Sequence, residues 1–145
     1  MLTLGDRPFT TGRCRFLDSD GTRDEPKIYA RVVPGNWTTP VLAQLDTGAA
    51  WSVLDTEIAE DLGLLDDRGE QAKLSTRLGL MNGSLVRIPF TVIAEEGESL
   101  RLDATVFVSR EWREGTFLGY GGLLERIRFA IDPGTNSFYF GSGAA

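Results

Sequence analysis

Turn-forming residues interrupt the apolar segments at short intervals along most of the chain, and this spacing limits the fold more than any other feature. Glycine occurs 17 times in 145 residues, and the apolar runs between the turns are short. Short extended runs separated by turn signals are typical of all-β domains with strands of about five to seven residues. The sequence therefore predicts strands at Phe16-Leu17 with their neighbours, Lys27–Val33, Val41–Leu45, Ala72–Leu80, Leu85–Ala94, Arg101–Val108 and Ser137–Phe140.

Two turn signals and two short helical patterns complete the expected secondary structure. Asn82-Gly83 lies between two extended runs, and both residues tolerate the positive φ that a type I′ hairpin turn requires. Asp132-Pro133-Gly134 predicts a second tight turn. Asp55 is placed to cap a helix over Thr56–Leu62, and a second helix is expected at about Gly122–Arg126.

The length of the chain fits one compact domain over residues 1–145, with an N-terminal extension at 1–26 and a loose tail at 141–145. No apolar run approaches the roughly 20 residues that a membrane-spanning helix needs. Met1–Arg15 has neither a basic opening nor a continuous apolar core, so it does not resemble a signal peptide. We therefore expect a cytoplasmic protein that has no membrane partner.

The absence of histidine and the single cysteine exclude several classes of chemistry. Histidine-based triads, histidine zinc sites and Cys-His pairs cannot form within the chain. Cys14 has no disulfide partner and no histidine to activate it, so it is expected to act as a small, half-buried hydrophobic residue. The net charge of −6 argues against a nucleic-acid partner. We expect no cofactor and no metal, which leaves carboxylates, hydroxyls or lysine for any hydrolytic chemistry.

One apolar strand ends in an aspartate that leads directly into a turn. Val41–Leu45 precedes Asp46-Thr47-Gly48, and the chain continues as Ala49–Leu54. A carboxylate at the end of a buried strand is costly unless it has partners or a function. Gly48 allows a sharp turn that brings its amide toward the carboxylate, and Thr47 supplies a hydroxyl able to anchor the loop. Two interpretations remain open: a catalytic aspartate, or a strand-ending turn capped by its own side chains.

The wider context of this aspartate resembles a known active-site loop. Leu45–Leu54 resembles the catalytic loop of the aspartic peptidases, specifically the single-lobed retropepsin-like family. In that family a hydrophobic pair precedes Asp-Thr-Gly-Ala, and a Ser or Thr follows at the place that Ser52 occupies here. Phe117-Leu118-Gly119, followed by Leu123-Leu124, resembles the family element that packs behind this loop.

The order of the elements strengthens the resemblance. The expected hairpin at Asn82-Gly83 lies between the two elements, as the flap hairpin does in the family, and Ile131–Gly134 resembles the closing turn of bacterial relatives. The resemblance extends over about Lys27–Phe140. It implies a closed, barrel-like all-β domain of the retropepsin type with a flap hairpin and one or two short helices.

The sequence departs from the retroviral members at two places. They carry two acids after Asp-Thr-Gly-Ala, where this chain has Ala50 and Trp51, and an arginine after the later glycine, where it has Tyr120. In the family that arginine pairs with the first of these acids, so both sides of one ion pair are missing together. Losing both partners costs far less than losing one. The departures therefore favour a divergent cellular, bacterial branch, although they put the substrate contacts of the viral enzymes in doubt.

The resemblance implies that peptide bonds are hydrolysed by water held between two carboxylates that share one proton. The chain contains a single Asp-Thr-Gly, and Asp132 is followed by a proline that lacks the necessary amide. The second carboxylate is therefore expected from another copy, which makes the enzyme a homodimer with Asp46 on its twofold axis. Phe138-Tyr139-Phe140 either pairs with its symmetry mate at the dimer seam or closes its own sheet.

The expected active site follows from the same resemblance. The catalytic residues are Asp46, Thr47 and Gly48, and an extended peptide or protein substrate would lie beneath the flap. Residues expected to bind this substrate are Ala49, Trp51, Val53, Leu80, Met81, Asn82 and Gly83. An ordinary surface role for the hairpin remains open, as does an ordinary core role for Trp51, Val53, Leu80 and Met81. The rival function is a noncatalytic peptide-binding or dimerisation module with the same fold, and a small ligand-binding β-barrel is a third interpretation.

Overall fold

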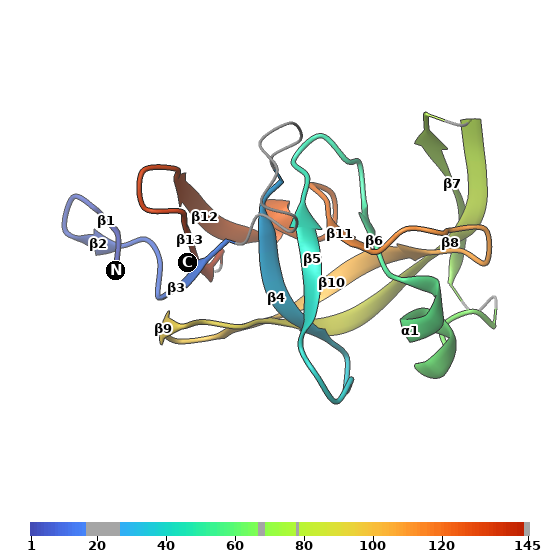
Figure 1. Ribbon diagram of the computed structural model, residues 1–145, viewed down its shortest axis with the longest axis horizontal. Coiled ribbons are helices and arrows are strands. Elements are labelled where there is room, and N and C mark those ends of the chain that lie inside the picture. Colours follow the sequence, from blue (N-terminus) through green and yellow to red (C-terminus); the bar gives the residue numbers. More distant parts are fainter. Residues whose placement is uncertain (17–26, 67–68, 78, 144–145) are drawn as a thin grey trace.

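The computed structural model describes residues 1–16, 27–66, 69–77 and 79–143 (Figure 1). Almost all regular structure in this part of the chain is β-strand, arranged as one large sheet, one four-stranded sheet and a small N-terminal ribbon. The ribbon consists of β1 (Thr3–Leu4) and β2 (Arg7–Pro8). The prediction of an all-β domain is confirmed.

Six strands of the large sheet close into a barrel. Their order is β10-β6-β11-β5-β4-β8, and β8 pairs with β10 to complete the ring. Closure removes free strand edges, which otherwise invite pairing with other chains. The bounds are β4 Tyr29–Pro34, β5 Val41–Leu45, β6 Ser52–Val53, β8 Gly79–Val92, β10 Leu100–Val108 and β11 Thr116–Leu118.

A hairpin extends from this barrel, and its turn differs from the predicted one. β7 (Glu70–Thr76) pairs with the first half of β8, and the chain reverses between Thr76 and Gly79. Asn82-Gly83 lies inside β8, so the prediction of a turn at these residues was wrong. The glycine has a different purpose: a Cβ on Gly83 would lie 2.4 Å from the Phe107 ring. Gly83 is thus needed for close packing, whereas Gly79 has a φ of +114° at the end of the turn.

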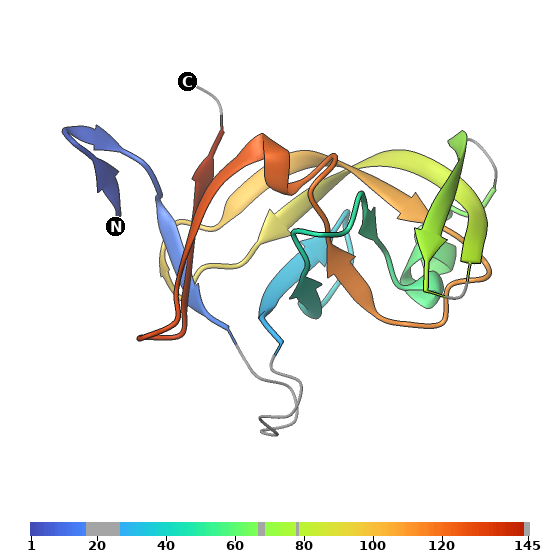
Figure 2. The same cartoon turned by 90° about the horizontal axis from the view of Figure 1, so that it is seen from above.

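The four-stranded sheet has the order β12-β13-β3-β9 and lies at the opposite end of the barrel from the hairpin (Figure 2). Its central strand β13 pairs on one side with β12 and on the other with β3, so both of its edges are occupied. The pairing of Phe138–Phe140 with a symmetry mate is therefore wrong, and the strand closes its own sheet. The bounds are β3 Gly12–Arg15, β9 Glu96–Gly97, β12 Ile127–Asp132 and β13 Ser137–Ser142.

Both ends of the chain contribute more to the fold than the sequence indicates. β3 lies within the expected N-terminal extension, because Cys14 pairs with Phe138 and is buried in the main core. The loose tail was predicted to begin at residue 141, yet Gly141 and Ser142 continue β13. Residues 17–26, including Leu17 of the first predicted strand, and residues 144–145 lie outside the described parts.

Of the two expected helices, one is present and the other is reduced to a turn. α1 spans Thr56–Asp61, and the Asp55 carboxylate accepts hydrogen bonds from two backbone N–H groups of its first turn, at 2.9 and 3.3 Å. The second segment forms only a 3₁₀ turn, η1, at Leu124–Arg126. Leu123 before it has a non-helical φ of −136°, and β12 begins directly after it, so no room is left for a full helix.

The apolar interior consists of two clusters. The main cluster fills the barrel and the space against the four-stranded sheet, with Phe90, Val106, Leu118, Phe138 and Phe140 among its fully buried members. A second cluster lies beside the hairpin and contains Val53, Leu74, Phe107 and Trp112, with Trp51, Met81 and Phe117 packed against it. The hairpin is thus attached to the barrel by an apolar contact of its own.

Candidate active site

Asp46 lies directly after β5, where two parallel barrel strands end together. β5 pairs with β11, and Leu45 stands opposite Leu118 in this ladder. The N–H of Asp46 continues the ladder by donating to the carbonyl oxygen of Leu118 at 2.9 Å. The half-buried carboxylate is therefore positioned by the barrel itself, as the sequence predicts for a strand-ending aspartate.

The turn after Asp46 orients this carboxylate. The N–H of Gly48 donates to Oδ1 of Asp46 at 3.0 Å, and the N–H of Ala49 donates to its carbonyl oxygen at 3.2 Å. A Cβ at Gly48 would meet only this Oδ1, at an ordinary 3.4 Å, so the space around Gly48 is otherwise open within 4 Å. Thr47 is exposed, and its hydroxyl does not anchor the loop to any residue in the described parts of the chain.

A second segment packs behind the loop that follows Asp46. Oγ of Ser52 accepts a hydrogen bond from the N–H of Gly119 at 2.9 Å, and the N–H of Tyr120 donates to the carbonyl oxygen of Ala49 at 2.9 Å. The contact is so close that a Cβ on Gly119 would lie 2.3 Å from the carbonyl oxygen of Trp51. Phe117-Leu118-Gly119 thus packs behind the loop, as the resemblance implies.

The residues expected to bind substrate are only partly brought together. Trp51 and Met81 pack against one apolar cluster, and Val53 belongs to that cluster with 2% of its surface exposed. Val53 therefore serves the core, an alternative that the sequence left open. Leu80 is 69% exposed on the hairpin, and Ala49 is half-buried in the catalytic loop.

The remaining two expected substrate residues, Asn82 and Gly83, face a loop that sequence reasoning did not single out. The N–H of Asn82 donates to Oε2 of Glu111 at 3.0 Å, and its carbonyl oxygen accepts from Oγ of Ser109 at 2.6 Å. The pairing of β8 with β10 begins only at Ser84. At Asn82, these two side chains therefore supply the hydrogen bonds that a neighbouring strand would otherwise supply. Trp112 from the same loop packs edge-on against Phe117 at 5.7 Å. No local sequence signal distinguishes such polar residues from ordinary loop residues.

A hollow of about 240 Å³ lies between the hairpin and this loop. Polar and apolar groups contribute about equally to its lining, and Asp46 is not one of the lining residues. The lining consists of Leu65, Gln71, Asn82, Gly83, Ser84, Val108, Ser109, Arg110 and Glu111.

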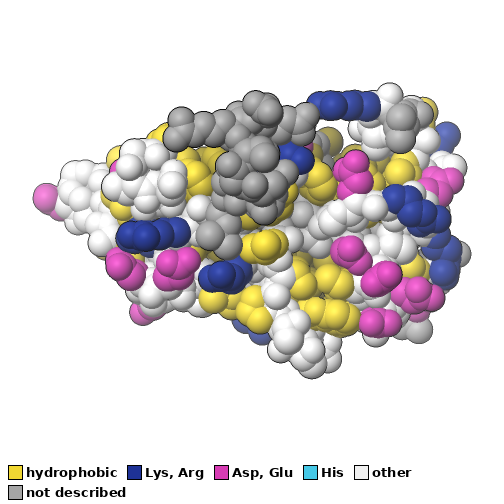
Figure 3. Space-filling model, in the orientation of Figure 1, with side chains coloured by type: hydrophobic (Ala, Val, Ile, Leu, Met, Phe, Trp, Pro, Cys, Tyr) yellow, Lys and Arg dark blue, Asp and Glu magenta, His cyan; other side chains and the backbone are white. Residues whose placement is uncertain are grey.

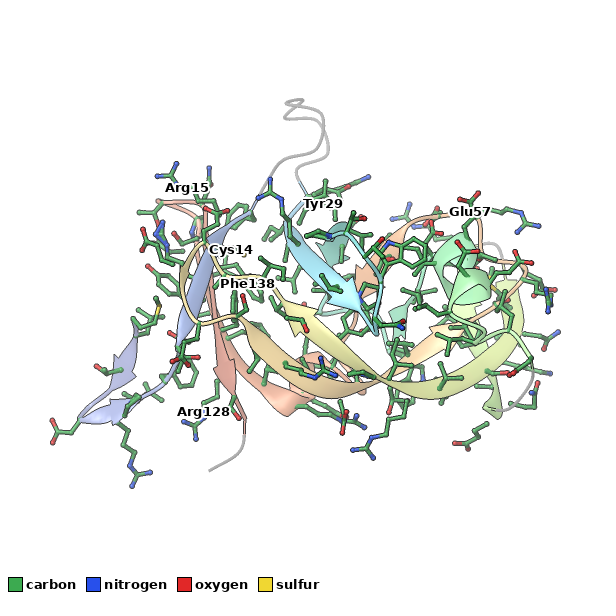
Figure 4. All side chains as sticks on the ribbon, turned by 90° about the horizontal axis from the view of Figure 1, so that it is seen from below. Cys14, Arg15, Tyr29, Glu57, Arg128 and Phe138 are labelled. Carbon is green, nitrogen blue, oxygen red and sulfur yellow. The ribbon has the colours of Figure 1, made fainter. Side chains whose placement is uncertain are left out.

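The rest of the described chain offers little other chemistry. Cys14 lies on the four-stranded sheet beside Phe138, far from α1, and its burial raises the pKa of the thiol to about 11 (Figure 4). No group of three or more possible metal-ligating His, Cys, Asp or Glu side chains occurs within the described ranges.

Basic and acidic side chains are interspersed on the face shown in Figure 3. None of the described helices is long and apolar enough to cross a membrane.

Comparison with known proteins establishes the architecture. No protein-family model matches the chain, and no curated protein matches it in sequence. Among solved structures, a retropepsin-like aspartic protease from Rickettsia conorii superposes with a TM-score of 0.57 over 90% of this chain and 91% of that one. The chain has the retropepsin-like fold. At 21% identity the likeness concerns the fold alone, and within this retropepsin-like fold Asp46 lies at the open end of the β5–β11 ladder.

Proposed function

We propose that this protein is an aspartic endopeptidase that hydrolyses peptide bonds as a homodimer. The observation that carries the proposal is the position of Asp46, a half-buried residue whose carboxylate is oriented by the Gly48 N–H at the end of two barrel strands. The similar structure from Rickettsia conorii is described as an aspartic protease, which supports the same chemistry here.

The proposed reaction needs a second carboxylate. Water attacks a peptide carbonyl when one carboxylate accepts its proton and a protonated partner donates a proton to the carbonyl oxygen. Asp132 is not a candidate partner, because its Oδ1 accepts from the Gly134 N–H at 2.9 Å and its Oδ2 accepts from the Thr135 hydroxyl at 3.0 Å. These bonds close the β12–β13 turn of the other sheet. The second Asp46 must then come from another copy of the chain.

The β7–β8 hairpin is the proposed cover of the substrate. β7 is the last strand of its sheet, so no other strand in the described part of the chain covers its outer edge, where an extended peptide can pair. Closing a hairpin over a peptide excludes water and strengthens the electrostatic interactions of the two carboxylates. Trp51 and Met81 connect the catalytic loop to this hairpin through the second apolar cluster.

The test compares the parent protein with Asp46→Asn and with Asp132→Asn as a matched control. Each is incubated with a diverse peptide mixture from about pH 4 to about pH 7, where such carboxylate pairs work, and new termini are read by mass spectrometry. We expect cleavage by the parent and by Asp132→Asn, and none by Asp46→Asn. Cleavage by all three would indicate a contaminant.

The rival function is a noncatalytic peptide-binding module, which the lack of acids at Ala50 and Trp51 favours. No cleavage by a parent protein that is shown to be dimeric, together with retained peptide binding, would support this module and contradict the enzyme.

A further inference from the structure

Tyr120 combines a fixed backbone with an exposed ring. Its N–H donates to the carbonyl oxygen of Ala49 at 2.9 Å, and its own carbonyl oxygen accepts from the N–H of Glu125 at 3.0 Å. The glycines on both sides lie against the catalytic loop so closely that neither has room for a Cβ. Nevertheless 53% of the tyrosine surface is exposed. Because its backbone is already fixed, this residue loses little backbone entropy when another surface covers its ring.

The surroundings of Tyr120 are uncharged. Across residues 41–54 and 115–124, which include the catalytic loop and the segment behind it, Asp46 is the only charged residue. Thr47, Gly48 and Ala50 of this loop are exposed together with Tyr120. The chain as a whole carries a net charge of −6, and a surface without charges is one at which contact between two copies adds no local like-charge repulsion.

The geometry of the proposed reaction places this surface next to a second copy. Two carboxylates that share a proton lie about 3 Å apart, so the twofold axis passes about 1.5 Å from each of them. Tyr120 is bonded to the residue that follows the Asp46-Thr47-Gly48 turn, and it therefore lies near the same axis. β13 does not compete for this role, because both of its edges are already paired.

We infer that the seam of the homodimer crosses Tyr120, whose ring packs on the exposed catalytic loop of a second copy. The inference rests on the proposed function, since it uses the twofold axis at Asp46, and it adds the location of the seam. This contact brings the second Asp46 to a site that a single chain leaves with one carboxylate.

The test measures the dimer dissociation constant by sedimentation for Tyr120→Ala, Tyr120→Phe and Tyr120→Asp. Leu4→Ala is the matched control, because Leu4 is 64% exposed and lies on the N-terminal ribbon, far from the β5–β6 loop (Figure 1). Loss of a central aromatic contact weakens association by about tenfold or more. We expect this for Tyr120→Ala, less than about threefold for Tyr120→Phe, and no change for Leu4→Ala.

Tyr120→Asp keeps the inference testable if Tyr120→Ala is poorly folded, because an exposed acid disturbs the monomer little. In a dimer of Tyr120→Asp, one aspartate from each copy would lie near the twofold axis, and the two negative charges would repel each other. The dissociation constant of this variant should therefore exceed that of Tyr120→Ala, and it should fall as added salt screens the repulsion. At protein concentrations high enough to restore the dimer, Tyr120→Ala should cleave peptides at the parent rate.

The outcomes separate this inference from the proposed function. Unchanged dissociation constants for Tyr120→Ala and Tyr120→Asp, with cleavage by the parent, would place the seam elsewhere and leave the peptidase intact. A lower rate per dimer with unchanged association would make Tyr120 a substrate contact and overturn the seam. A parent that stays monomeric and inactive at every concentration would overturn both.

Discussion

Ser52 and Gly119 are 67 residues apart in the sequence and are joined by a buried hydrogen bond of 2.9 Å from the glycine N–H to the serine Oγ. The bond connects the strand that follows the catalytic loop to the segment that supports it. A buried N–H that loses its acceptor costs about 1–3 kcal/mol of stability. The loop therefore depends on one hydroxyl for part of its fixed position.

The first prediction concerns this hydroxyl. Ser52→Ala should lower the free energy of unfolding by about 1–3 kcal/mol, because the Gly119 N–H is left buried without an acceptor. Ser75→Ala, on the exposed face of β7, should change it by less than about 0.5 kcal/mol. Urea unfolding followed by circular dichroism measures both. Equal stability of Ser52→Ala and the parent would contradict the supporting role of this bond.

The second prediction uses the two kinds of glycine in the fold. Gly83→Ala places a Cβ 2.4 Å from both the Phe107 ring and the Val108 carbonyl oxygen, so overpacking should cost about 1–3 kcal/mol. Gly115→Ala meets nothing within 4 Å and should be neutral or stabilise by up to about 1 kcal/mol. Thermal unfolding of the two variants checks the contrast. A melting temperature for Gly83→Ala that matches the parent would argue against the close packing of β8 on β10.

The third prediction concerns the cap of α1. Asp55→Ala removes the acceptor of the two N–H groups of the first turn and should cost about 0.5–2 kcal/mol. Asp61→Ala, at the last residue of the same helix, removes an acid near the negative end of the helix dipole and should not destabilise. Urea unfolding distinguishes the two, and comparable losses for both would mean that the loss at Asp55 does not come from its capping hydrogen bonds.

The fourth prediction follows from the buried thiol. Burial raises the pKa of Cys14 from 9.0 to about 11, so the folded state holds this proton more tightly than the unfolded chain. The resulting stability is present below pH 9 and is lost as the pH rises toward 11. The parent should therefore lose more stability than Cys14→Ala between these pH values, which paired urea titrations measure. Equal losses would show that the thiol is accessible in the folded state.

Local patterns were sufficient for several elements of the fold. The apolar run Val41–Leu45 became β5 with the predicted bounds, and the Asp55 signal placed α1 correctly, because both depend on neighbouring residues. The place of Asp46 at the end of β5 was predicted for the same reason, and its catalytic role stays a prediction. A cytoplasmic location stays a prediction.

Long-range packing decided the features that the sequence did not reveal. The sequence does not distinguish a glycine that is needed for packing against Phe107 from a glycine that forms a turn. For this reason Asn82-Gly83 was predicted to be a turn, although it lies inside β8. β6 and β11 are strands of two and three residues, too short to show a period, and they are defined by parallel pairing across the barrel. The role of Phe138 depended on β3, whose partner strand lies at the other end of the sequence.

β8 belongs to the hairpin and to the barrel at once, and this has a mechanical consequence. Its outer half is supported by β7 and its inner half by β10, and the two supports overlap only at Ser84-Leu85. A force at the hairpin tip therefore bends β8 about this overlap, because β8 runs without a break from the hairpin into the barrel. Opening of the hairpin should then be elastic and fast, with a restoring force that comes from the barrel wall itself.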